Sequence, residues 1–150
     1  SLKSIIPTII TQALKKPNNI KLGNIHTGRD FNYVRDITTA YLKVIKSKNK
    51  HIFGKDYNVG SGTCLKITKI IDIISLILNK KITVKIDNKR LRPNNSEVIN
   101  LIADNSKFKK EFNWKPEFSR NKHLISSFKE TIEWYEKNID KFQNIKNYNF

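Results

Sequence analysis

Apolar residues recur at helical spacing in five segments of the chain, and polar residues bound each segment. Two of these predicted helices have a candidate capping side chain, Asp36 before one and Thr68 at the start of the other. For the shortest helix, which ends at Phe112, either Asp104 or Asn105 fits the capping position. The predicted helices span residues 6–16, 37–47, 68–80, 105–112 and 123–138.

Short stretches rich in β-branched and aromatic residues lie between these helices and predict strands. In chain order they read IKLG, RDFNYV, DYNVG, ITVKID and VINLIAD. DYNVG runs into a Gly-Ser-Gly turn, and a loop containing Pro93 separates the last two stretches. Helices and strands are mixed along the chain without an internal repeat, which indicates an α/β fold.

The chain carries 29 Lys and Arg against 13 Asp and Glu, a formal net charge of +16. Such an excess is typical of proteins that bind nucleic acids or anionic membranes. The Lys residues are scattered and are not interleaved with aromatic residues, which favours codon drift in an A/T-rich genome over a nucleic-acid partner. The longest apolar stretch is interrupted by Asp72 and Ser75 and is too short to span a membrane, so no membrane partner is expected.

The single cysteine, Cys64, excludes an internal disulfide and is typical of a reducing compartment, so we expect a cytoplasmic protein. The chain opens on Ser1 without the features of a signal peptide, and we expect it to be part of a longer protein. His26, His51 and His123 have no Cys or carboxylate at ligand spacing, which argues against a metal site.

Two arginine-bearing loops are the best candidates for chemistry. Arg29 follows the turn NIHTG, while Arg90 and Arg92 precede Pro93 in the second loop. A guanidinium presents a planar fork to phosphate oxygens, so two converging arginines can neutralise and orient a diphosphate. The residue chemistry alone favours solvated surface arginines or ion pairs with Asp30 or Glu97 over such a site. The turn at Gly60–Gly62 lacks both a nucleophile elbow and the Lys of a phosphate-binding loop.

Five motifs in register give the chain a family resemblance. They are LGNIHTGRDFNYVRD, YNVGSG, RLRPNNSEV, INLIADNSKFKKEFNWKPEF and FKETIEWYEKN. In this order they resemble the C-terminal half of extended short-chain dehydrogenases/reductases that act on nucleotide sugars. The chain is most similar to NAD-dependent 4,6-dehydratases, particularly those of the legionaminic-acid pathway, which are related to GDP-mannose 4,6-dehydratase. Only the segment SRNKHLISS departs from the pattern.

The resemblance implies a role for each matching residue. Arg29 and Arg92 would lie on opposite sides of the nucleotide diphosphate. Glu97 would reach the ribose, although two additional residues separate it from Arg92 compared with the GDP-mannose enzymes. Leu22 and Asn24, in LGN, would lie near the nucleobase.

The resemblance also implies what the chain lacks. The dinucleotide-binding half that holds NAD and the catalytic residues are expected upstream of Ser1, so this chain alone is expected to be inactive. Residues 1–138 would form the substrate-binding region with the last Rossmann strand, DYNVG, and residues 139–150 a flexible tail. The expected substrate is a UDP- or GDP-linked sugar, and the full-length enzyme is expected to be a homodimer.

Alternative functions remain open at this point. A 4-epimerase or decarboxylase of the same superfamily would use the same diphosphate clamp. The charge of +16 keeps a basic binding module as an alternative of another class, and an inactive fragment is a third. Without the rest of the Rossmann domain, we expect the helix after Asp36 to leave an apolar face uncovered.

Overall fold

The computed structural model describes residues 4–119 and 123–142, which divide into two compact units. The first unit consists of residues 4–26, 67–97 and 128–142, and the second of residues 27–66, 98–119 and 123–127. The predicted region 1–138 therefore contains two compact bodies, and the chain passes between them several times.

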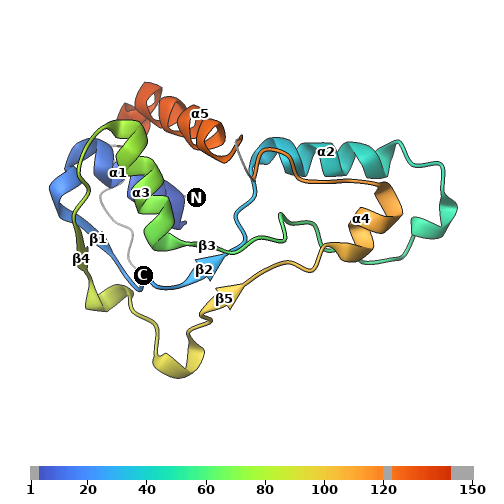
Figure 1. Cartoon of the computed structure of the whole chain (residues 1–150), viewed down its shortest axis with the longest axis horizontal. Coiled ribbons are helices and arrows are strands. Elements are labelled where there is room, and N and C mark those ends of the chain that lie inside the picture. Colours follow the sequence, from blue (N-terminus) through green and yellow to red (C-terminus); the bar gives the residue numbers. More distant parts are fainter. Residues whose placement is uncertain (1–3, 120–122, 143–150) are drawn as a thin grey trace. The chain divides into compact units, whose positions relative to one another are not determined.

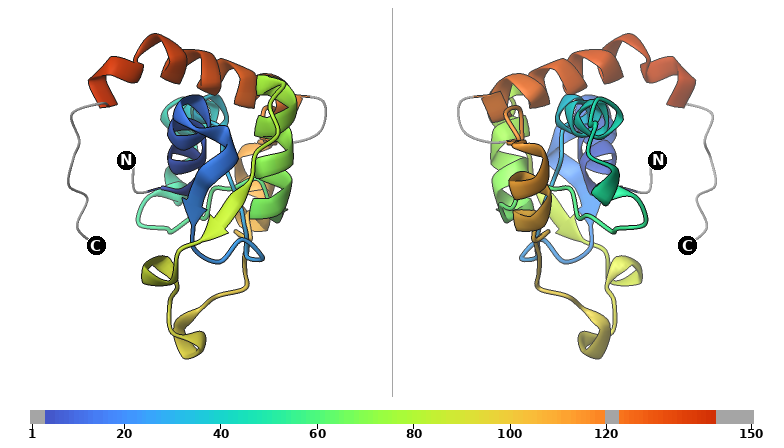
Figure 2. Two further views of the ribbon diagram at one scale, coloured as in Figure 1. Left: turned by 90° about the vertical axis from the view of Figure 1, so that its left-hand side faces the viewer. Right: turned by 90° about the vertical axis from the view of Figure 1, so that its right-hand side faces the viewer.

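A pair of parallel strands lies at the centre of the first unit. Strand β1 (Ile20–Leu22) pairs with β4 (Val84–Ile86) in the register Ile20 to Val84. Helices α1 (Ile5–Lys15) and α3 (Ile67–Leu78) lie against the strands, and Figure 2 shows this arrangement. The buried apolar side chains of this unit are Ile9, Ile10, Ala13, Ile20, Leu22, Ile67, Ile70, Ile71, Ile73, Ile74, Phe128 and Ile132.

A glutamine side chain covers the outer edge of β1. The backbone N–H of Lys21 donates to Oε1 of Gln12 at 2.8 Å, and Nε2 of Gln12 donates to the Lys21 carbonyl at 3.1 Å. The primary amide thus provides the donor and acceptor that a neighbouring strand would supply. This contact fixes α1 to the strand pair.

A small three-stranded sheet organises the second unit, with the strand order β3-β2-β5 (Figure 1). Strand β2 (Gly28–Arg29) runs antiparallel to β3 (Leu65–Lys66) and parallel to β5 (Asn100–Leu101). Backbone bonds from Gly28 N to Ile99 O, at 2.7 Å, and from Asp30 N to Leu101 O, at 2.9 Å, join β2 to the β5 segment.

The core of the second unit is aromatic and lies between helices α2 (Val34–Ile45) and α4 (Ser106–Phe112), which are neighbours in Figure 1. Phe108 contacts the ring of Phe112 at a centroid separation of 4.6 Å and that of Trp114 at 5.4 Å. The Trp114 indole N–H donates to Thr39 Oγ1 at 3.0 Å, which ties the cluster to α2. The cluster consists of Ala40, Val44, Ile52, Tyr57, Val59, Phe108, Phe112 and Trp114.

The predicted helices are confirmed, whereas two of the predicted caps are wrong. Helix α2 begins at Val34, so Asp36 lies inside its first turn. Helix α3 begins at Ile67, so Thr68 is likewise inside the helix. For α4 the capping position is Asn105, which makes no side-chain cap bond, and the carboxylate of the preceding Asp104 accepts from the Ser106 N–H at 3.0 Å.

The predicted strands are only partly confirmed. In RDFNYV only Arg29 belongs to a strand, and no residue of DYNVG is assigned to one. A strand is recognised by its hydrogen-bonded neighbour, and none of the described residues pairs with DYNVG. Several residues of α2 that the apolar pattern assigns to the core are exposed, including Tyr41 at 66% and Ile45 at 76%.

The remaining elements are α5 and five short 3₁₀ turns. Helix α5 (His123–Lys137) confirms the predicted last helix, and the turn that follows it occupies part of the expected tail, of which residues 143–150 lie outside the described residues. No helix within the described ranges is long and apolar enough to cross a membrane. The 3₁₀ turns are η1 (Pro17–Asn19), η2 (Lys50–Ile52), η3 (Asn88–Arg90), η4 (Asn94–Ser96) and η5 (Ile139–Phe142).

Candidate functional site

Arg29 lies on β2, the central strand of the sheet in the second unit. Its Nη1 donates to the carbonyls of Gly28 and Val98, each at 2.7 Å. Val98 immediately precedes the β5 segment, so these bonds hold the guanidinium against the backbone of the neighbouring strand. A guanidinium oriented by carbonyl acceptors keeps its full positive charge and is presented in a restricted direction.

The next residue, Asp30, is surrounded by donors from two other segments. Its Oδ1 accepts from the N–H of Ser61 at 2.9 Å and from the hydroxyl of Ser61 at 2.6 Å. Its Oδ2 accepts from the N–H groups of Gly62 at 2.8 Å and Ala103 at 3.2 Å. The carboxylate therefore joins β2 to the Gly-Ser-Gly turn and to the segment after β5.

Two glycines allow this close approach. A Cβ on Gly60 would lie 2.5 Å from the Cβ of Ala103 and 2.8 Å from Oδ2 of Asp30, so a side chain does not fit there. Gly62 has a φ of +68°, in the left-handed region that glycine adopts without strain. The sequence predicts a simple turn at Gly60–Gly62, whereas in the structure this turn wraps around the carboxylate of Asp30.

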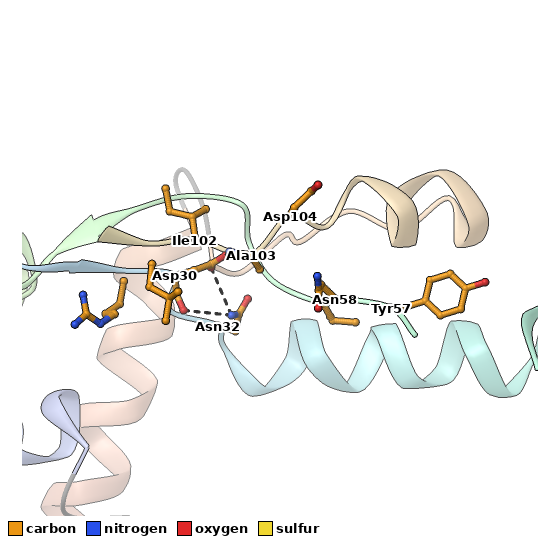
Figure 3. Close-up of a pocket in the computed structure, with 10 residues that line it drawn as sticks. Asp30, Asn32, Tyr57, Asn58, Ile102, Ala103 and Asp104 are labelled. Carbon is orange, nitrogen blue, oxygen red and sulfur yellow. Dashed lines mark hydrogen bonds between the residues drawn. The ribbon is translucent and has the colours of Figure 1, made fainter. Parts of the chain in front are cut away.

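A pocket of about 530 Å³ opens beside this sheet in the second unit (Figure 3). Its wall combines the guanidinium of Arg29 and two carboxylates, those of Asp30 and Asp104, with two asparagine amides. Figure 3 shows the bond between Asn32 and Asp30 on the pocket wall. The lining residues are Arg29, Asp30, Asn32, Tyr57, Asn58, Val59, Leu101, Ile102, Ala103 and Asp104.

Two groups on this wall have shifted pKa values. Hydrogen bonds from the Ser106 side chain and backbone N–H lower the pKa of the Asp104 carboxyl below its usual value. Desolvation, followed by the charge of Glu111, raises the pKa of the Tyr57 phenol. The Tyr57 hydroxyl is buried without a hydrogen-bond partner among the described residues, and its ring carries the Lys107 ammonium 4.7 Å from the centroid.

The other predicted site residues lie in the first unit. Leu22 is 1% exposed and belongs to the core, and its carbonyl accepts from the Asp87 N–H at 2.8 Å, so this residue is not open to a ligand. Oδ1 of Asn24 accepts from the His26 N–H at 2.9 Å, which shapes the loop after β1. Arg92 is exposed and Glu97 is partly buried.

One contact brings the two loops of the first unit together. A Cβ on Gly23 would lie 2.5 Å from the carbonyl oxygen of Arg90, so the loop after β1 packs directly on the backbone that leads to Arg92. Arg90 itself pairs with Asp87 at 3.3 Å. The structure thus gathers Leu22, Asn24 and Arg92 on neighbouring loops of the first unit, while Arg29 belongs to the second.

Sequence reasoning missed the roles of Asp30 and Asp36. Asp36 is 1% exposed, and its oxygens accept from the N–H groups of Glu117, Phe118 and Ser119 and from the hydroxyl of Ser119. The sequence did contain a clue to these roles. Asp30 and Asp36 lie on either side of a stretch with apolar residues, and a carboxylate in a partly buried segment requires hydrogen-bond donors. The partners themselves lie far away in the sequence.

The Gly-Ser-Gly turn is not a binding site for the phosphates of a dinucleotide cofactor. The N–H groups of Ser61 and Gly62, which a phosphate would require, already donate to Asp30. No cluster of three or more His, Cys, Asp or Glu side chains suited to a metal ion occurs within residues 4–119 and 123–142.

Comparison with known proteins agrees with the resemblance in the sequence. Residues 2–126 match the family model described as GDP-mannose 4,6 dehydratase. The UDP-glucuronate 4-epimerase of Thermodesulfobacterium geofontis is 32% identical over 133 residues, which is 88% of this chain and 37% of that protein. The chain thus spans well under half the length of this relative.

Solved structures show the same fold. The UDP-glucuronic acid 4-epimerase of Bacillus cereus, in complex with UDP-glucuronic acid and NAD, matches 91% of this chain with a TM-score of 0.77 and 20% identity. The dTDP-glucose 4,6-dehydratase of Bacillus anthracis, in complex with NAD, matches 93% with a TM-score of 0.71 and 24% identity. This chain covers 41% of either structure. The chain belongs to the GDP-mannose 4,6 dehydratase family, among the Rossmann-like extended short-chain dehydrogenases/reductases whose members include nucleotide-sugar dehydratases and epimerases.

Proposed function

We propose that this chain binds the diphosphate of a nucleotide sugar as part of an NAD-dependent 4,6-dehydratase of the legionaminic-acid type. The observation that carries the proposal is the guanidinium of Arg29, which β2 and the β5 segment hold in a restricted orientation. Arg92 is the second cation, on the loop that packs against Gly23. Two guanidinium groups provide the charge and the paired donors that a diphosphate requires.

The remaining residues have assigned roles in the proposal. The loop that begins at Leu22 contacts the nucleobase through the partly exposed residues Gly23 and Asn24, because Leu22 itself is buried. Glu97 accepts a hydrogen bond from the ribose. Binding the nucleotide at a distance from the reacting carbons orients the sugar, and this orientation lowers the barrier of the chemical step.

The chemistry is proposed to belong to a longer protein that contains these residues. NAD, held by other residues of that protein, would supply the reversible hydride transfer that a 4,6-dehydratase requires. The proton-transfer groups and the dinucleotide site are assigned to the rest of that protein. It would act in the cytoplasm as a homodimer on a UDP- or GDP-linked sugar.

A titration of the chain with UDP and with GDP tests the binding proposal. Arg29→Gln and Arg92→Gln should each weaken binding of the preferred nucleotide about tenfold, because each substitution removes a charged hydrogen-bonding partner. Arg35→Gln is the matched control, because this side chain stacks on Phe118, 5.4 Å from the ring centroid, and should change the Kd less than about twofold. Absence of saturable binding to either nucleotide would reject the proposal.

A 4-epimerase is the second candidate, and the 32% identity to the UDP-glucuronate 4-epimerase favours it. The two activities give different products from the full-length protein with NAD. A dehydratase releases water and yields a 4-keto-6-deoxy sugar, whereas an epimerase yields an isomer of unchanged mass. Mass spectrometry of the product therefore separates them.

A basic binding module is the candidate of another class, and the net charge of +16 favours it. It predicts affinity for oligonucleotides that falls steeply with salt. Binding of UDP or GDP without binding of oligonucleotides would reject it.

A further inference from the structure

Asp30 has an unusually complete set of hydrogen-bond donors for a carboxylate beside a candidate anion-binding arginine. Three backbone N–H groups and one hydroxyl, from Ser61, Gly62 and Ala103, lie between 2.6 and 3.2 Å from its two oxygens. The Asn32 amide approaches Oδ1 at 3.5 Å. These donors come from the two segments that flank β2, so one side chain ties together three parts of the second unit.

Asp30 directly follows strand β2, so its bonds hold the end of the strand that carries Arg29. The backbone of Arg29 lies opposite Leu65 on one side and Leu101 on the other. The carboxylate of Asp30 fixes the strand that carries Arg29 to both of its neighbours.

The saturation of Asp30 also has an electrostatic consequence. A carboxylate with open lone pairs next to Arg29 would compete for the guanidinium and repel a phosphate. Donors from Ser61, Gly62 and Ala103 direct partial positive charge at both oxygens instead. These bonds tie both oxygens of Asp30 to the segments beside β2.

We propose that Asp30 is a positioning residue for Arg29. It holds β2 in register, so that the guanidinium meets the diphosphate in a fixed orientation. Pre-organisation of this kind raises affinity because less freedom is lost on binding. This inference rests on the proposed nucleotide binding for its effect on affinity, whereas its effect on the sheet is independent of any ligand.

The chain provides a closely matched control for the test. Asp36 also accepts three backbone N–H bonds and one serine hydroxyl bond, but they come from residues 117–119 and not from the segments beside β2. Asp30→Asn and Asp36→Asn remove the same charge, and each disturbs three backbone N–H bonds and one serine hydroxyl bond. Asp30 additionally accepts from the Asn32 amide. Ser61→Ala removes a single hydroxyl from Asp30 and is the milder variant if Asp30→Asn does not fold.

Two readouts are measured on each variant. Amide hydrogen exchange reports the bonds from Gly28 to Ile99 and from residue 30 to Leu101, which join β2 to the β5 segment. Titration with UDP and GDP reports affinity. Asp30→Asn should accelerate exchange at these two amides about tenfold relative to the amides of α4 and raise the Kd about tenfold. Ser61→Ala should change both by about threefold.

Asp36→Asn should not change the exchange rates of the two amides relative to the amides of α4, and it should change the Kd by less than about twofold. Equal effects of Asp30→Asn and Asp36→Asn on both readouts would overturn the inference. If the unmodified chain binds neither nucleotide, the proposed function fails, and hydrogen exchange alone decides the inference. Faster exchange at the β2 amides supports it, and unchanged exchange overturns it.

Discussion

Asp30 and Asp36 hold the second unit together in the same way, each accepting hydrogen bonds from three backbone N–H groups and one serine hydroxyl. Asp30 binds the turn at Ser61, and Asp36 binds the segment at Ser119. The stretch RDFNYVRD therefore begins and ends with an Arg-Asp pair in which the aspartate organises a distant loop. Arg35 complements the second pair by stacking on Phe118, 5.4 Å from its ring centroid.

Loss of the Asp36 carboxylate should strongly destabilise the fold. Asp36→Ala leaves four donors, three of them backbone N–H groups, without their acceptor in a buried site, which should lower the free energy of unfolding by about 3 kcal/mol or more. Urea denaturation gives the value. Thr38→Ala, on the exposed side of the same helix, should cost less than about 0.5 kcal/mol. Similar costs for the two variants would contradict the role of the buried carboxylate.

Gly60 should not tolerate a side chain. Gly60→Ala would place its Cβ against Ala103 and Asp30, and the overlap should lower the stability by about 1–3 kcal/mol in thermal or urea unfolding. The double variant Gly60→Ala, Ala103→Gly removes one of the two clashes and should recover part of the loss. If the double variant is no more stable than Gly60→Ala, the Cβ of Ala103 is not what excludes the side chain.

The carboxylate of Asp104 should make the fold sensitive to acid. Its pKa is below the usual value of 3.8 because it accepts bonds from Ser106, so the charged form is stabilised by folding. Its contribution is present above pH 3.8 and is lost as the pH falls through the lower folded pKa. Asp104→Asn should therefore reduce the difference between urea midpoints at pH 7 and pH 2.5. An unchanged difference would exclude this carboxyl as a contributor.

Helix α2 should make the isolated chain prone to self-association. Val34, Tyr41 and Ile45 recur at helical spacing and are 66%, 66% and 76% exposed, which is an apolar face of the kind that other chains bind. Replacing Tyr41 and Ile45 by Ser should shift the chain toward monomer in light scattering. Leu76→Ser on α3 removes an equally exposed apolar side chain, at 69%, and should have a smaller effect. A monodisperse unmodified chain with one sharp thermal transition would contradict the prediction.

The local pattern predicted the helices well and the strands poorly. The apolar periodicity of a helix is a local property of the sequence, so the ends of α1, α3 and α5 could be predicted to within a few residues. A strand depends on its neighbour, and the two-residue strands around Arg29 are defined by Leu65 and Leu101, which are distant in sequence. The sequence predicted a helix start after Asp36, because aspartate is a common capping residue. The helix begins at Val34 instead, and the Asp36 carboxylate accepts hydrogen bonds from the N–H groups of residues 117–119.

The sequence by itself determined the α/β composition and the family, because motifs such as RDFNYV and YNVGSG are read directly from residue order. It also singled out Arg29 and Arg92, since only arginine combines a permanent charge with a planar fork. Only the tertiary structure decided what the carboxylates of Asp30 and Asp36 do. Hydrogen-bond donors from loops far along the chain converge on them, and no local pattern of residues encodes which loops will meet.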